Sequence, residues 1–331
     1  MDCMPLDASK EVPHNKLEIS KISFGAGVFS GRYNSLEENW PLEAVRRALE
    51  LGINCFDTSP YYNNSELILG DALEKLKNEY PRSHYYLSTK CGRYGHTKSD
   101  FNYSPKRVEE SVIESCRRLK TTYLDIVLAH DVEFVSVDEA TKAIEKLFEL
   151  KANGIIKHVG ISGYPLEVLL HITEIQYAKS QPLDVILSYS HYTLQSTLFA
   201  DYIGRFRALG VKTLINGSPL SMGLFRSSPP PKWHPASTEL RKAAAECAEL
   251  AKRHNLSIAR LALQFAFQWK DVDSTMIGLS NKEEVEYAID AWNEVKAREK
   301  GEKTIPVTEV DVLKEITRLL EPYYNISWPS P

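Results

Sequence analysis

LDIVLAHDVEFVSVDEATKAIEKLFELKANGIIKHVGIS, residues 124–162, contains the repeating unit that builds this chain. It begins and ends with short apolar runs, Leu124–His130 and His158–Ser162, which are typical of buried strands. Between them lies a segment with apolar residues at helical spacing, opened by two acidic residues and closed by Gly154. A strand, a helix and a second strand in this order predict two parallel strands joined by a right-handed crossover.

The same unit recurs along the whole chain. Short apolar, β-rich runs alternate with helical patterns, and the sequence contains eight such runs. They are Ile22–Val28, Asn54–Asp57, Tyr85–Lys90, Leu124–His130, His158–Ser162, Val185–Ser188, Lys212–Asn216 and Ser274–Ile277. Eight strand–helix repeats predict an α/β protein with a single (β/α)8 barrel of the TIM type. No Gly, Pro and Ser-rich linker divides the chain, so we expect residues 1–331 to form one domain, although the length alone would allow two.

The sequence also contains segments in addition to the eight strand–helix units. The apolar stretch Leu256–Trp269 predicts an extra buried helix before the eighth strand. TEVDVLKEITRLL, residues 308–320, predicts an amphipathic helix that packs outside the barrel. The longest irregular stretch, residues 218–237, is rich in aromatic residues and prolines, and we expect a functional loop there rather than a flexible linker.

Composition excludes several classes of protein. With 43% hydrophobic and 25% charged residues, the chain has the balance of a globular protein. A net charge of −4 offers no attraction for nucleic acid or anionic lipid, and no apolar run approaches the roughly 18 residues of a membrane span. The five cysteines are scattered without a CxxC pair, and the N-terminus lacks the pattern of a secretion signal. We therefore expect a cytoplasmic protein without disulfides, a metal site, or nucleic-acid or membrane partners.

Four polar residues lie where such barrels carry their chemistry, at or after the carboxyl ends of strands. Asp57 ends the second run, Lys90 the third and His130 the fourth, while Tyr62 follows Asp57 by five residues. Singly, each has a structural explanation: a turn cap, a ring closing the barrel, a lysine reaching solvent, or a satisfied buried histidine. Together they bring four ionisable groups to one barrel mouth, which costs more free energy than packing alone explains. We interpret them as a catalytic site.

The chain resembles the aldo-keto reductase family in GINCFDTSPYYNNSELILGDAL, STK, LDIVLAH, IKHVGISG, SPLSMGL and IGLSNKEEVE. The resemblance covers essentially the whole chain and implies a barrel that binds a nicotinamide cofactor without a Rossmann domain. It maps the family's catalytic tetrad onto Asp57, Tyr62, Lys90 and His130. A phenol titrates near pH 10 in water, so Tyr62 needs the Lys90 ammonium, held by Asp57, to exchange protons near neutrality. His130 is expected to bind the substrate oxygen.

The resemblance also implies where the cofactor binds. The matching positions are Gly25, Ala26, Gly27, Ser162, Ser188, Gly217, Ser218, Leu220, Gly278, Ser280 and Glu284. Three positions depart from the family's pattern. Gly163 replaces the Asn of the usual Ser-Asn pair, Ser188 stands where many relatives have Gln, and Gly217 replaces an aromatic residue that stacks under the nicotinamide. We expect Tyr192 or the backbone to support that ring instead. Taken alone, the glycine-rich turn at residues 25–27 is equally well explained as a tight strand–helix connection.

The segment after the eighth strand predicts which nicotinamide is used. Relatives that prefer the phosphorylated cofactor carry Lys or Arg there, because a cation pairs with the 2′-phosphate. This chain has Glu284, which repels that phosphate and can accept a hydrogen bond from a free ribose 2′-hydroxyl. We expect NAD, while the nearby Lys282 leaves use of NADP open. The alternative role of Glu284 is in the solvated start of a helix.

Two longer passages, LDVILSYSHYTLQ at 183–195 and SPLSMGLFRSSPPPKWHPAS at 218–237, are similar to sugar-oxidising members of the family. The resemblance implies NAD-dependent oxidation of an aldose at C1 to its aldonolactone, in ascorbate or erythroascorbate synthesis. D-arabinose, L-galactose and L-fucose fit this description equally well. The candidate sugar contacts are His191, Tyr192, Phe225, Trp233 and His234. Core packing is an equally good explanation for the three that lie in the 218–237 loop.

Two other functions are compatible with the same residues. An NADPH-dependent aldehyde or ketone reductase would differ in cofactor preference and would turn over free aldehydes faster than aldoses. A cofactor-sensing regulatory subunit would show weak turnover and a stable partner complex, which the intact tetrad disfavours. We expect a small aldose as the binding partner of a monomer or weak homo-oligomer.

Overall fold

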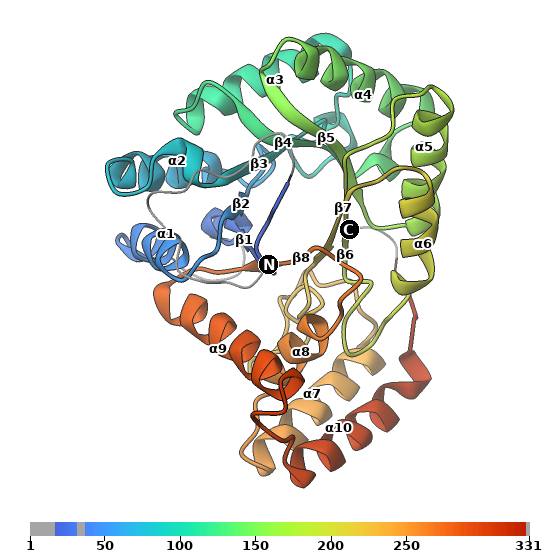
Figure 1. Cartoon of the computed structure of the whole chain (residues 1–331). Helices are drawn as coiled ribbons and strands as arrows, with labels where there is room; N and C mark the ends of the chain where they lie inside the picture. The colour runs from blue at the N-terminus through green and yellow to red at the C-terminus, as the bar shows by residue number, and fades with distance from the viewer. Residues whose placement is uncertain (1–16, 32–36, 329–331) are drawn as a thin grey trace.

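The computed structural model describes residues 17–31 and 37–328, shown along the chain in Figure 1. The N-terminal stretch searched for a targeting signal lies outside this part of the chain. Within the described residues, eight parallel strands close into a barrel in sequence order, which confirms the predicted (β/α)8 class. The strands are β1 Ile22–Gly25, β2 Cys55–Asp57, β3 Tyr86–Cys91, β4 Leu124–His130, β5 Ile156–Gly163, β6 Val185–Tyr189, β7 Thr213–Gly217 and β8 Ser274–Gly278.

Helices connect the strands and surround the barrel (Figure 1). Their starts follow from the sequence, since Ser104 accepts a hydrogen bond from Arg107 N and Ser136 forms a capping box with Glu139. The α-helices are α1 Trp40–Glu50, α2 Ser65–Leu76, α3 Pro105–Arg118, α4 Val137–Ala152, α5 Leu166–Ala178, α6 Ala200–Ala208, α7 Thr238–Arg253, α8 Ile258–Phe267, α9 Lys282–Glu299 and α10 Val307–Leu320. The 3-10 turns are η1 Ala26–Ser30, η2 Arg82–His84, η3 Lys98–Asp100, η4 Val132–Phe134 and η5 Glu321–Tyr323. Within residues 17–31 and 37–328, no helix is both long and apolar enough to cross a bilayer.

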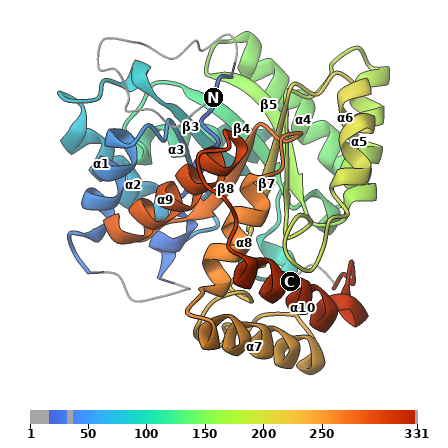
Figure 2. The same cartoon turned by 60° about the horizontal axis from the view of Figure 1, so that its bottom comes forward.

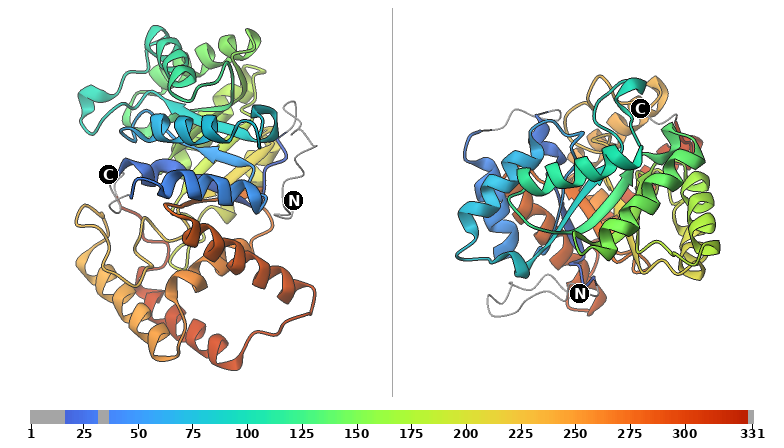
Figure 3. Two further views of the ribbon diagram at one scale, coloured as in Figure 1. Left: turned by 90° about the vertical axis from the view of Figure 1, so that its left-hand side faces the viewer. Right: turned by 90° about the horizontal axis from the view of Figure 1, so that it is seen from above.

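The extra helix before β8 is not the one that the sequence predicts. α8, which covers most of the predicted segment 256–269, packs beside α9 in the ring around the barrel, whereas α7 packs against α10 outside it. Figure 2 and the left view of Figure 3 both show α7 and α10 side by side, away from the strands. The prediction was wrong because α8 is apolar on two faces: Phe267 joins the main core, and Leu261 joins the core formed with α7 and α10.

The first strand is also shorter than the predicted run Ile22–Val28. β1 ends at Gly25, and the chain continues as the 3-10 turn η1. The apolar pattern continues past the strand because Val28 and Phe29 are buried in the main core from that turn. The apolar run Ile22–Val28 therefore predicts correctly that most of these residues are buried, but its last three residues form a 3-10 turn and not a strand.

Side chains inside the barrel form a cluster of their own. Its strand residues are Cys55, Tyr86, Ile126, Leu128, Val185, Leu187, Ile215 and Met276. Side chains alternate along a strand, so residues two or four positions further toward the carboxyl end also point inward. These residues are Asp57, Lys90, His130, Tyr189, Gly217 and Gly278. The barrel is therefore apolar through its middle and polar at the carboxyl ends of its strands.

The barrel interior leaves no room for a side chain at Gly160 of β5. A Cβ there would lie 2.2 Å from the carbonyl oxygen of Val185 and 2.7 Å from Leu128 Cδ2. We expect Gly160→Ala to lower the free energy of unfolding by about 1–3 kcal/mol through overpacking, measured by urea denaturation. Gly204→Ala is the matched control, because a Cβ on this exposed α6 residue meets none of the described atoms within 4 Å. The control should be neutral or stabilising by up to about 1 kcal/mol. An unchanged unfolding midpoint for Gly160→Ala would contradict the tight packing.

Candidate active site

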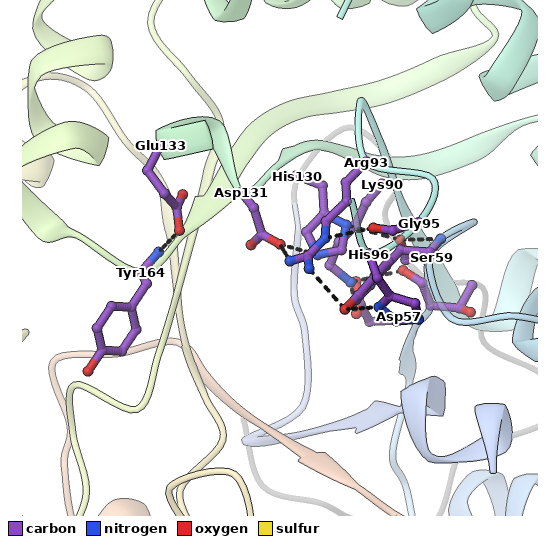
Figure 4. Close-up of polar contacts among 12 residues, drawn as sticks. Asp57, Ser59, Lys90, Arg93, Gly95, His96, His130, Asp131, Glu133 and Tyr164 are labelled. Carbon is purple, nitrogen blue, oxygen red and sulfur yellow. Dashed lines mark hydrogen bonds and ion pairs between the residues drawn. The ribbon is translucent and has the colours of Figure 1, made fainter. Parts of the chain in front are cut away.

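The structure brings the predicted tetrad together at the carboxyl end of the barrel, and Figure 4 shows three of its members, Asp57, Lys90 and His130. Asp57, Lys90 and His130 end or nearly end three neighbouring strands, β2, β3 and β4. Tyr62 lies in the loop between β2 and α2. Because adjacent parallel strands deliver their carboxyl ends to one edge, the four side chains converge from three connections.

Lys90 and Asp57 form a buried ion pair between Nζ and Oδ2, and each side chain is only 3% exposed. Lys90 Nζ also donates to the carbonyl oxygen of Thr58 at 2.9 Å, and Ser88 Oγ donates to Asp57 Oδ1 at 2.8 Å. Two charges removed from water are tolerated only when they are paired and hydrogen-bonded in this way. The pair therefore fixes an ammonium group at the barrel mouth.

Tyr62 lies against this ammonium group. Lys90 Nζ is 5.0 Å from the centroid of the half-buried Tyr62 ring, and the ring meets that of His130 edge to face at 5.8 Å. A Cβ on Gly27 would lie 3.2 Å from Tyr62 Cε2, so the glycine leaves space for the phenol. The phenol of Tyr62 therefore lies next to a fixed positive charge and next to the His130 ring.

His130 is buried and neutral. Burial, together with the Lys90 and Arg93 cations, holds the pKa of His130 well below its usual value. Its Nδ1 lies 3.1 Å from Ser59 Oγ, and its Nε2 lies 3.4 Å from Asp131 Oδ2. With Ser59 donating to Nδ1, the ring proton lies on Nε2, and the imidazole can donate one hydrogen bond there.

A second buried ion pair, which the sequence analysis does not predict, borders His130 (Figure 4). Arg93 Nη1 donates to Asp131 Oδ2 at 2.5 Å, and Arg93 Nη2 donates to Tyr61 Oη at 2.9 Å. Tyr61 Oη in turn lies 3.1 Å from His96 Nδ1. Asp131 could have been found as an acidic residue directly after His130 at a strand end. Arg93 belongs to a loop whose path the sequence does not reveal.

Ser162 and Gly163 of β5 lie on the other side of His130. Ser162 pairs in register with His130, and its buried Oγ has no hydrogen-bond partner among the described residues. A Cβ on Gly163 would lie 2.5 Å from Glu133 Oε2, while Glu133 Oε1 accepts a hydrogen bond from Tyr164 N at 3.0 Å. The departure from the Ser-Asn pattern thus has a physical reason, since the Glu133 carboxylate occupies the space of the missing side chain.

These residues fit a nicotinamide cofactor. The orphaned Ser162 Oγ offers a hydrogen-bonding group beside the tetrad, where a carboxamide needs one. Gly217 brings no side chain, but Tyr189, its register neighbour on β6, points inward and is half-buried, with its ring centroid 5.4 Å from that of Tyr164. An aromatic ring is therefore present one strand away from the position where the family pattern has it.

The side chains of Ser188 and Tyr192, two predicted contacts in and after β6, point away from the tetrad. Ser188 lies between the inward-pointing Leu187 and Tyr189, so it points outward, and its Oγ lies 2.9 Å from His191 Nδ1. Tyr192 stacks on Trp269 with centroids 3.8 Å apart and planes 12° apart. The structure therefore does not bring Ser188 or the Tyr192 ring to the tetrad, because strand alternation and stacking on Trp269, just after α8, decide their directions.

The remaining predicted sugar contacts divide into packed and exposed residues. Burial lowers the pKa of His191 to about 4, and its ring lies 4.5 Å from that of Tyr164. Phe225 is fully buried in the core beside α7 and α10. His234 donates from Nε2 to the carbonyl oxygen of Ser221 at 2.8 Å and so braces the loop, while the neighbouring Trp233 is 37% exposed.

The loops that should hold the cofactor's phosphates are tightly built. Ser218 has a left-handed φ of 57°, and its Oγ accepts a hydrogen bond from Met222 N at 2.7 Å, while Leu220 is half-buried between two cores. Gly25 and Gly278 are register partners, and a Cβ on Gly278 would lie 2.5 Å from Val28 Cγ1. These glycines therefore close the β1–β8 seam, as the tight-connection explanation expects.

Ala26 and Ser280 complete the predicted cofactor positions. Ala26 is buried, and its carbonyl oxygen accepts a hydrogen bond from Ser65 Oγ at 2.7 Å. Glu284 Oε2 accepts from Ser280 N at 2.6 Å, while Glu284 N donates to Asn281 Oδ1 at 2.9 Å. Glu284 therefore helps to cap α9 and places its carboxyl group at that helix start.

The comparisons with known proteins agree with this geometry. Residues 21–303 match the aldo/keto reductase family. The chain is 37% identical to the L-galactose dehydrogenase of Arabidopsis thaliana, over 95% of this chain and 94% of that one. It is 36% identical to the D-arabinose 1-dehydrogenase of Saccharomyces cerevisiae, over 96% of each chain.

Solved structures show the same fold. An aldo-keto reductase from Bacillus halodurans in its holo form has a TM-score of 0.65 at 24% identity, covering 91% of this chain and 93% of that one. The glycerol dehydrogenase of Gluconobacter oxydans has a TM-score of 0.65 at 19% identity, covering 98% and 99%. The chain therefore belongs to the aldo/keto reductase family and is an NAD(P)-dependent oxidoreductase that acts on CH–OH groups.

Proposed function

We propose that the chain is an NAD-dependent aldose 1-dehydrogenase, which oxidises the hemiacetal carbon of a sugar to its aldonolactone. The observation that carries the proposal is the buried Lys90–Asp57 pair against Tyr62, with the neutral His130 beside it. The names of the two relatives at 36–37% identity, a galactose and an arabinose dehydrogenase, support a sugar as the substrate.

Each member of the tetrad has one task in this reaction. Tyr62, as phenolate, removes the proton of the C1 hydroxyl, and Lys90 stabilises the phenolate because Asp57 holds the ammonium in place. His130 Nε2–H donates to the same substrate oxygen and orients it. A bound nicotinamide would supply the hydride acceptor for C1, whose bond to the deprotonated oxygen becomes a C=O bond.

Three other residues would hold the cofactor. Ser162 would bind the carboxamide through its unpaired Oγ, and Tyr189 would face the nicotinamide ring in place of the aromatic residue absent at Gly217. Glu284, at the start of α9, would accept a hydrogen bond from the ribose 2′-hydroxyl and repel a 2′-phosphate.

The substrate class can be tested with a panel of initial rates. D-arabinose, L-galactose, L-fucose and D-glucose are each offered with NAD⁺ and with NADP⁺, and small free aldehydes with NADH and NADPH. We expect the highest kcat/KM for one of the first three sugars with NAD⁺. Faster reduction of free aldehydes by NADPH would instead establish the reductase alternative.

Removal of the Tyr62 hydroxyl tests its role in proton transfer. We expect Tyr62→Phe to lower kcat for the sugar by about 10²–10⁴-fold, because the phenol oxygen that takes the proton is removed while the ring remains. NADH binding, followed by protein fluorescence, and the urea midpoint should stay close to wild type. Near-normal turnover by Tyr62→Phe would contradict the assigned role.

Removal of the Glu284 charge tests its role in cofactor choice. We expect Glu284→Gln, which keeps an acceptor oxygen for Ser280 N but removes the charge, to raise kcat/KM for NADP⁺ relative to NAD⁺ by about 5- to 10-fold, as loss of one repulsive charge near a phosphate would. Glu283→Gln is the control, since this neighbouring side chain is 67% exposed and is expected to leave the ratio unchanged. A wild-type preference for NADP⁺ would contradict the argument from Glu284.

A further inference from the structure

Asp131 places a buried carboxylate beside His130 Nε2. It directly follows the last residue of β4 and is 2% exposed, and its Oδ2 lies 3.4 Å from His130 Nε2. In the proposed reaction, that nitrogen donates to the oxygen on C1. The Asp131 carboxylate therefore adjoins the place where the oxygen on C1 is proposed to bind.

The position is costly for the fold. Asp131 has φ 56° and ψ 56°, in the left-handed region, which Asp adopts more readily than most residues with a side chain. Its negative charge is removed from water, and Arg93 compensates only one of its oxygens. Oδ1 is buried and has no hydrogen-bond partner among the described residues. A buried acceptor left unpaired destabilises a protein unless another molecule satisfies it.

A purely structural ion pair looks different in this same protein. Arg298 and Glu309, both nearly buried, form a bidentate pair in which Nη1 meets Oε1 at 2.7 Å and Nη2 meets Oε2 at 2.8 Å. Both carboxylate oxygens are satisfied there, as is usual for stable arginine pairs. Arg93 instead gives one nitrogen to Asp131 Oδ2 and the other to Tyr61, so Asp131 Oδ1 is left without a partner among the described residues.

We propose that Asp131, held in place by Arg93, accepts a hydrogen bond from the hydroxyl on C2 of the aldose and so selects sugars that carry this hydroxyl. When O1 is held by His130 Nε2, the neighbouring carbon brings its own hydroxyl within reach of the adjacent carboxylate. The proposal deepens the proposed function and rests on it, because it needs an aldose bound at C1 between Tyr62 and His130.

The test compares each sugar with its 2-deoxy counterpart. D-arabinose is paired with 2-deoxy-D-ribose, which is the same pentose without its C2 hydroxyl, and L-galactose with 2-deoxy-L-galactose. We expect wild-type kcat/KM to fall about 10- to 100-fold on loss of the hydroxyl, the effect of a hydrogen bond to a charged partner. Asp131→Asn should lower kcat/KM for the hydroxylated sugar and bring the ratio to within about threefold of one.

Asp125→Asn is the matched control. Asp125 lies on the same strand at its other end, is fully buried, and also pairs with an arginine, Arg82 Nη2, at 2.5 Å. This variant should lower the urea midpoint without changing the ratio between the two sugars. NADH binding, followed by fluorescence, should be unaltered in Asp131→Asn. If Asp131→Asn does not fold, Arg93→Lys tests the same contact, because loss of the guanidinium fork should lower the ratio as well.

The outcomes separate the two proposals. A wild-type enzyme that oxidises no aldose would overturn the proposed function and this inference with it. One that oxidises each sugar and its 2-deoxy counterpart equally well would overturn only the role of Asp131. The same holds if a folded Asp131→Asn or Arg93→Lys enzyme keeps the wild-type ratio.

Discussion

Closure of parallel strands into a barrel is the constraint on which the rest of this structure depends. It forces every second side chain inward and delivers the carboxyl ends of all strands to one mouth. The middle of the barrel is filled by apolar side chains such as Leu128 and Val185, so polar groups have room only at its end. Asp57, Lys90 and His130 meet there because each continues the inward series of its own strand. The geometry of the site is thus a consequence of strand register.

Electrostatics then decides what the mouth can do. Two cations and two carboxylates are buried there as two pairs, Lys90 with Asp57 and Arg93 with Asp131. Pairing offsets the free-energy cost of removing these charges from water. The two cations also help to keep the pKa of His130 well below its usual value, so the ring is neutral. A neutral imidazole and a phenol beside an ammonium group suit the transfer of a proton from an alcohol. Asp131 Oδ1 has no partner among the described residues, and it is the proposed acceptor for the C2 hydroxyl of the sugar.

Prediction from sequence succeeds where a local pattern carries the information. The apolar runs locate every strand of the described barrel, and the tetrad lies at the ends of three of them and in the loop after β2. It fails for α8, which contributes residues to two separate cores. An apolar segment of this kind looks like an extra helix, but α8 belongs to the ring around the barrel and α7 is the extra helix. It also fails for the directions of side chains after β6, where Ser188 turns to His191 and Tyr192 stacks on Trp269.

The sequence by itself determined the barrel class, the family and the identity of the four tetrad residues, since strand periodicity and residue type are local properties. Tertiary structure alone decided that Glu133 fills the space above Gly163, that Tyr189 lies beside the missing aromatic residue, and that Arg93 reaches Asp131. These contacts join residues from different strand–helix connections. Their distances depend on loop paths and register across the closed barrel, which no single segment of the chain encodes.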